Sequence, residues 1–191
     1  RTLSLRDSSW KIRGNEGLDS KRVLGLHDSI PLIFMVDSTR FMALSPRGVL
    51  EFYHTGKSVF IGEDAGRSDD HSDNMNVFVG YSCGAANEQG LNNVAVGAES
   101  FKSNTSGLGN TAIGKGSLTS NTIGEYNTAT GLTALEKNSS GDLNCAYGAY
   151  ALRSNTTGEA NVAMGVNSLD KNLTGNENSA VGNLTMQHNA T

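Results

Sequence analysis

The stretch from residue 110 to residue 131 reads NTAIGKGSLTSNTIGEYNTATG and contains the phrase N-T-A-x-G twice, seventeen residues apart. The phrase begins at Asn110 and again at Asn127. Asn, Thr, Ala and Gly contribute little to catalysis, and a phrase that returns at a fixed spacing is typical of repeat architectures. The period therefore decides the fold.

The repeat extends over residues 76–191. We number its seventeen places from the opening asparagine: place 5 is the first glycine, place 12 a second asparagine and place 15 another glycine. A degenerate copy, SVFIG at 58–62, precedes the array by eighteen residues. The residues that define the repeat are Asn93, Gly97, Asn104, Gly107, Asn110, Gly114, Asn127, Gly131, Asn144, Gly148, Asn161 and Gly165.

Three further places are constrained in size. Place 3 is alanine in every copy except the first, which has Phe78, and place 8 is always small. Place 9 is bulky and apolar except at Gly84. Two short segments separated by glycine turns, with a narrow and a bulky apolar column, predict a parallel β-solenoid whose coils stack about 4.8 Å apart. We expect the glycines to supply corners with positive φ and the asparagines to bond along the stack. A helical pair is disfavoured because Gly, Asn and Thr weaken helices.

The strand phrase also predicts an interface. Places 2 and 4 face away from the place 3 alanine, because alternate residues of a strand point to opposite sides. A thin coil cannot bury both faces, so an apolar outer stripe indicates association of several copies, most simply as a parallel trimer. The predicted trimer-face residues are Val94, Val96, Ile113, Cys145, Tyr147, Val162, Met164 and Val181.

The N-[ST]-A-[IV]-G phrase, followed by a small residue and Leu, resembles the head repeats of trimeric autotransporter adhesins, the YadA-like β-roll. Arrays of this kind are also similar to those of bacterial surface fibres and phage-type tail fibres. The resemblance covers 76–191 well and 58–75 loosely, and it implies left-handed coils and a homotrimer. The adhesin heads use a shorter repeat of about fourteen residues, so each coil here should carry a longer turn.

Residues 1–56 do not repeat and predict a small β-rich module, an adaptor or tip of a fibre. The expected strands are WKIRGN (10–15), RVLGL (22–26), PLIFMV (31–36), RFMALS (40–45) and GVLEFY (48–53), with a tight hairpin at D-S-T. The short module just ahead of the array also resembles those of bacterial fibre proteins. The predicted organisation is this module at 1–56, an irregular first coil at 57–75 and the β-roll at 76–191.

The charge and the apolar content of the chain limit the kinds of partner that are expected. The net charge is −4, and nucleic acids and anionic membranes both require a basic surface, so neither is expected as the main partner. No apolar run approaches the roughly 18 residues of a membrane span. The chain begins without Met and ends in mid-repeat, which predicts a piece of a longer protein, so compartment is not judged from missing signals.

The sequence contains few residues arranged for a disulfide, a metal site or catalysis. Cys83 and Cys145 lie four repeats apart, about 19 Å along the stack, too far for a disulfide within one chain. The acidic cluster at 69–73 is interpreted as a solvated loop rather than a metal site. No nucleophile, phosphate-loop or paired-carboxylate motif is present, so neither a cofactor nor a metal nor enzymatic activity is expected.

The leading hypothesis is a non-catalytic trimeric fibre segment, extracellular or on the cell surface, that binds a glycan or protein of a host or prey cell. A phage-type tail fibre on a virion is the alternative. A carbohydrate-active β-helix enzyme and an ice-binding solenoid are less favoured. Candidate contact residues lie in the variable places: Lys102, Lys115, Tyr126, Lys137, Arg153 and Lys171.

Overall fold

The structure, a computed structural model, describes residues 32–36, 38–53 and 55–187. All the regular secondary structure in this part of the chain consists of β-strands. The chain divides into two compact units, residues 1–51 and residues 52–191. Each is considered by itself, and the second carries the repeat.

A small sheet lies at the beginning of the described chain. It consists of β1 (Leu32–Val36), β2 (Thr39–Leu44) and β3 (Leu50–Phe52) in the order β1-β2-β3. β1 and β2 run antiparallel, and Ser38 between them has a φ of 61°, which confirms the hairpin predicted at D-S-T. The other two predicted strands, 10–15 and 22–26, lie outside the described residues.

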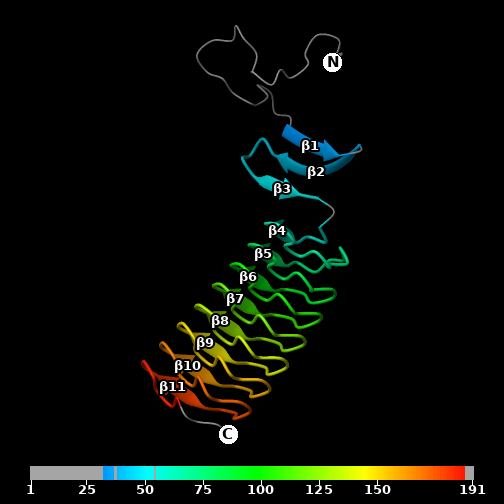
Figure 1. Ribbon diagram of the computed structural model, residues 1–191. Helices are drawn as coiled ribbons and strands as arrows, with labels where there is room; N and C mark the ends of the chain where they lie inside the picture. Colours follow the sequence, from blue (N-terminus) through cyan, green and yellow to red (C-terminus); the bar gives the residue numbers. More distant parts are fainter. Residues whose placement is uncertain (1–31, 37, 54, 188–191) are drawn as a thin grey trace, which may run out of the picture. The chain divides into compact units, whose positions relative to one another are not determined.

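The second unit is a parallel β-solenoid, as the seventeen-residue period predicts. Each coil contributes one three-residue strand, and the strands pair in parallel one coil after another along one side of the solenoid (Figure 1). The register advances by seventeen residues per coil, except for the eighteen between Val59 and Val77. The strands are β4 (Val59–Ile61), β5 (Val77–Val79), β6 (Val94–Val96), β7 (Thr111–Ile113), β8 (Thr128–Thr130), β9 (Cys145–Tyr147), β10 (Val162–Met164) and β11 (Ser179–Val181).

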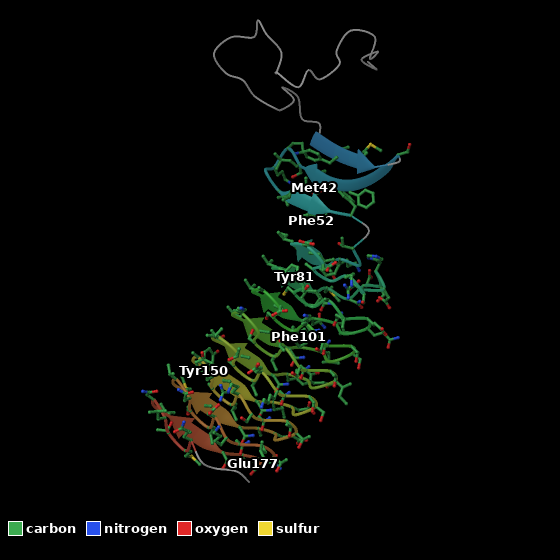
Figure 2. The ribbon with its side chains drawn as sticks, viewed as in Figure 1. Met42, Phe52, Tyr81, Phe101, Tyr150 and Glu177 are labelled. Carbon is green, nitrogen blue, oxygen red and sulfur yellow. The ribbon has the colours of Figure 1, made fainter. Side chains whose placement is uncertain are left out.

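The core is a narrow column of alanines packed against a column of bulky side chains, as predicted from places 3 and 9. Ala112 and Leu118 are each at most 1% exposed, and the same holds for both columns from Ala95 to Leu169, whereas Met186 in the last copy is exposed. Phe101, labelled in Figure 2, lies inside its coil. The bulky residues at place 9 adopt φ values of 48° to 54° from Phe101 to Met186, a left-handed conformation unusual for large side chains.

The first two coils reverse this arrangement. Phe60 and Phe78 occupy place 3, and Gly66 and Gly84 occupy place 9. A Cβ added at Gly84 would lie 2.5 Å from the Phe78 ring, and one at Gly66 would lie 2.5 Å from the Phe60 ring. The aromatic ring therefore fills from place 3 the space that Leu fills from place 9 in later coils.

Asparagines at places 1 and 12 form two ladders through the core, as expected. At place 1, the backbone N–H of Asn110 donates to Asn93 Oδ1 at 2.9 Å, and at place 12, Asn121 Nδ2 donates to Asn104 Oδ1 at 3.0 Å. Within a coil both amides also donate to the place 15 carbonyl: Gly124 O accepts from Asn110 at 2.9 Å and from Asn121 at 3.0 Å. The ladders thus satisfy polar groups that would otherwise be buried without a partner.

The two glycine columns serve different purposes. Place 5 glycines have φ between 124° and 140°, which confirms the expected corner. For place 15 the expectation of positive φ is wrong. At Gly124 the requirement is space, because an added Cβ would lie 2.4 Å from Asn121 Oδ1 and 2.7 Å from Gly141 O. Glycine stands there so that the amides can reach the carbonyl.

The acidic cluster at 69–73 is exposed, as expected of a solvated loop, except at Asp69. Asp69 occupies the equivalent of place 12 in the first coil and is only 5% exposed. Its carboxylate accepts from the His71 backbone N–H at 2.8 Å and from Asn74 Nδ2 at 3.2 Å. Ser58 similarly replaces the place 1 asparagine, since its Oγ accepts from the Asn76 N–H at 2.9 Å. The irregular coil therefore continues the polar core with different residues.

Candidate interaction surface

The strands β5 to β11 present a continuous outer face. Along β6, Ala95 is completely buried, whereas Val94 and Val96 on either side of it are each 38% exposed. The same alternation recurs in the other strands because the coils stack in register. We define the outer strand face as the side chains at places 2 and 4 of these strands.

All eight residues predicted from the sequence lie on this face. Six of them are exposed to at least 38%, and Cys145 and Val162 are half-buried. Their contact with a second chain stays a prediction. The eight are Val94, Val96, Ile113, Cys145, Tyr147, Val162, Met164 and Val181.

The apolar surface extends beyond the strands. Places 17 and 6, which flank the outer strand face along the chain, also carry large exposed apolar residues. Sequence reasoning missed them because it considered only the strand phrase, although the spacing of two residues continues through 17, 2, 4 and 6. The flanking residues are Met75, Tyr81, Tyr126, Leu132, Leu143 and Val166.

The broadened face is almost free of charge. Among places 17, 2, 4 and 6 from Met75 to Asn183, only Lys115 and Glu177 carry a charged side chain. The face spans seven strands about 4.8 Å apart and is at most about 20 Å wide. Its area is therefore at most about 700 Å². The largest apolar patch of a typical monomer is about 300–600 Å². The face, which also includes polar residues such as Asn92 and Thr111, is therefore comparable in size with the largest apolar patches of monomers.

A second surface, at place 13, is polar. The hydroxyl groups of Thr105, Thr122, Ser139 and Thr156 each donate to the carbonyl oxygen at the same place of the next coil, at 2.9 to 3.1 Å. With the donor used within the solenoid, each oxygen keeps its acceptor capacity for solvent or a ligand. The column is thus a row of hydrogen-bond acceptors.

Three of the candidate contact residues are engaged within the chain. Lys102 Nζ lies 3.0 Å from Glu99 Oε1, and this hydrogen bond lowers the pKa of Glu99. Arg153 Nε lies 3.0 Å from Asp170 Oδ1, with its guanidinium 5.3 Å from the Tyr150 ring centroid.

Lys171 Nζ lies 3.8 Å from the same buried Asp170 carboxylate. Lys137 is exposed away from the outer strand face, at place 11. Lys115 and Tyr126 belong instead to the flanks of that face.

The two cysteines are free, as expected. Cys83 is buried at place 8, its Sγ 3.3 Å from the Ala95 carbonyl oxygen, and burial raises its pKa to about 11. Partial burial also raises the pKa of Cys145. Neither thiol is activated as a nucleophile, because activation requires a lowered pKa.

Among the described residues, no group of three or more His, Cys, Asp or Glu side chains is placed to hold a metal ion. Asn104, Asn138, Asn155 and Asn172, which begin N-x-[ST] sequences, are completely buried in the ladder, so a glycan has no access to them. The described part of the chain also contains no helix long and apolar enough to cross a bilayer.

Comparison of the chain with protein-family models, with curated proteins and with solved structures gives no match. The candidate surface is therefore judged on its own geometry and composition.

Proposed function

We propose that this chain is a segment of a non-catalytic fibre in which three copies associate in parallel, as left-handed solenoids, through their outer strand faces. The fibre displays binding surfaces toward a glycan or protein on another cell. It belongs on a bacterial cell surface, and the same rod is suited to a phage-type tail fibre.

The observation that carries this proposal is the large, charge-poor outer strand face. Together with its flanks at places 17 and 6 it has an area of at most about 700 Å², of the same order as the roughly 800 Å² that each partner contributes to a stable protein interface. Burying the face against copies of itself removes Val96, Ile113 and Met164 from water together, which is favourable by about 25 cal/mol per Å² of apolar area. A parallel arrangement brings the same columns together along the whole stack.

The mechanism is multivalent contact. A trimer presents three copies of every surface outside the interface, including the place 13 acceptor row and the exposed Lys137. Linked weak sites gain avidity through effective concentration, by about 10²-fold to 10⁴-fold. A rigid rod suits this role because it fixes the spacing of the sites.

Sedimentation velocity tests the assembly. We expect the chain to sediment as a trimer at micromolar concentration, and the double variant Val96→Glu/Ile113→Glu to sediment as a monomer with an unchanged circular dichroism spectrum. Both sites are exposed in the single chain, so the carboxylates leave the coil intact but carry a desolvation cost in the interface. Ser106→Glu, at exposed place 14, is the matched control and should remain trimeric. A parent chain that sediments as a monomer contradicts the proposal.

Ligand binding is tested separately with a glycan array. The trimer should bind its glycan at least about 100-fold more tightly than the monomeric double variant does, since avidity is lost with the assembly. Equal binding per chain by the two forms would exclude the multivalent mechanism.

A further inference from the structure

The outer strand face contains one polar interruption at place 4. Along this column every residue from β5 to β11 is apolar or aromatic except Thr130, which lies between Ile113 and Tyr147 of the neighbouring strands. Thr128, at place 2 of the same strand, points to the same side. β8 therefore carries two hydroxyl groups in the middle of the face.

These two hydroxyls differ from those of the threonines at place 13. The place 13 hydroxyls all donate to a carbonyl oxygen of the next coil. Within the described part of the chain, the hydroxyls of Thr128 and Thr130 form no hydrogen bond. Both side chains are half-buried. They are satisfied by water in a single chain, and they lose that water when the face is covered.

A periodic face leaves the register of association open. Since the coils repeat every 4.8 Å or so, two copies can slide by a whole coil and still bring apolar columns together. Only positions that depart from the period distinguish one register from another. In the parallel arrangement in register, Thr130 faces Thr130 of the neighbouring copies, and the hydroxyls can pair. A slip of one coil places Thr130 against Ile113 or Tyr147 and buries its hydroxyl without a partner.

We propose that Thr130 is a register-determining layer that a second copy of this chain must match. Thr128 beside it does not oppose a slip toward Thr111, which carries a hydroxyl at the same place of β7. The inference rests on the proposed parallel assembly and adds what fixes its register. A buried, unpaired hydroxyl disfavours a slipped assembly by about fivefold or more per hydroxyl, so each neighbouring chain multiplies the preference. Polar residues in otherwise apolar interfaces fix register in the same way in coiled coils.

Cross-linking between place 2 thiols measures the register directly. All chains carry Cys83→Ser, which matches the serine at place 8 of other coils. One population keeps Cys145, and the other carries Cys145→Val/Val162→Cys, which moves the thiol by one coil. The two are refolded together and treated with a thiol oxidant, since a disulfide joins only cysteines whose Cα atoms lie within about 7 Å of each other. Assembly in register joins like thiols, whereas a slip of one coil joins position 145 to position 162.

We expect like-to-like products to dominate in this background. Thr130→Val in both populations should keep the trimer, because valine is close to threonine in shape and apolar, but raise the fraction of unlike products at least about fivefold. Thr157→Val, the same change at an exposed position off the face, should leave the fraction unchanged.

The outcomes separate the two proposals. A monomer in sedimentation refutes the proposed assembly. A trimer in which Thr130→Val leaves the product ratio unchanged, or in which unlike products already dominate, refutes the register layer alone. A trimer that yields neither product also refutes it, because the place 2 columns then do not meet.

Discussion

At the scale of single residues, the first two coils have their large core side chain at place 3, whereas the later coils have it at place 9. Phe78 and Gly84 are each an exception to their column, and they occur in the same coil because the ring occupies the space of the missing side chain. Phe78 also continues the core column, since its ring centroid lies 5.6 Å from that of Phe60 and 6.3 Å from that of Phe101. The two substitutions are therefore complementary.

This complementarity predicts a rescue. Phe78→Ala should destabilise the fold by about 3–5 kcal/mol by leaving a cavity, and Gly84→Leu alone should destabilise it by overpacking against the ring. The double variant should recover most of the loss, because leucines at place 9 elsewhere already adopt the φ near +50° that Gly84 has, at 57°. Urea denaturation of all four forms measures the coupling. Additive losses would show that the two sites do not share one space.

At the scale of the coil, the asparagine ladders connect each coil to its neighbours through side chains. Asn121 donates to Asn104 Oδ1 and to Gly124 O, and accepts from Asn138 Nδ2 at 2.9 Å. Removing it takes one hydrogen bond from each of three buried groups, although Asn104 Oδ1 still accepts from Gly107 N–H, Gly124 O from Asn110, and Asn138 Nδ2 still donates to Gly141 O. Each lost hydrogen bond contributes about 0.5–1.5 kcal/mol.

We accordingly expect Asn121→Ala, which removes three hydrogen bonds, to lower the free energy of unfolding by about 1.5–4.5 kcal/mol. Asn183→Ala, at an exposed position, is the control and should change it by less than about 0.5 kcal/mol. Chemical denaturation provides both values, and a loss below 1 kcal/mol or so for Asn121→Ala would mean that water replaces the ladder.

The sequence predicted the coil and its inward residues because the places under structural constraint keep the same kind of residue in almost every copy of the repeat. It did not predict why place 15 is glycine, since a column shows that a position is constrained but not which neighbour constrains it. The flanks of the outer strand face were missed for a related reason: Met75, Tyr81 and Leu143 vary from coil to coil. The role of Asp69 was hidden by the eighteen-residue spacing of the first coil.

At the scale of the whole solenoid, an interior coil hydrogen-bonds mainly to the coils directly before and after it. In the coil at 110–126, the N–H of Gly114 donates to Val96 O in the preceding coil. The N–H of Thr111 donates to Asn127 O in the following coil, and both distances are 2.8 Å. Stability in such an array is approximately a sum of coil and nearest-neighbour terms. Coils should therefore be removable and repeatable as units.

Deleting residues 110–126 joins Gly109 to Asn127 and preserves every place of the repeat. We expect cooperative unfolding to persist, with the denaturant m-value lowered by about one eighth, and a tandem duplication of the same residues to raise it by a similar amount. Both are measured by urea titration followed by circular dichroism. A second transition in either variant would show that the coils are not equivalent units.

The two asparagine ladders have one more consequence. The backbone bonds between strands run both up and down the stack, since Val94 N donates forward to Asn110 O and Gly97 N donates back to Val79 O, so their dipoles largely cancel. The asparagine amides all donate backward, toward the preceding coil.

Each ladder therefore behaves as a chain of aligned dipoles, positive toward Asn87 and negative toward Asn172, as the peptide groups of a helix do. Parallel copies carry these dipoles side by side in the same direction, a repulsive contribution that salt screens. Association through the outer strand face should for this reason strengthen as ionic strength rises.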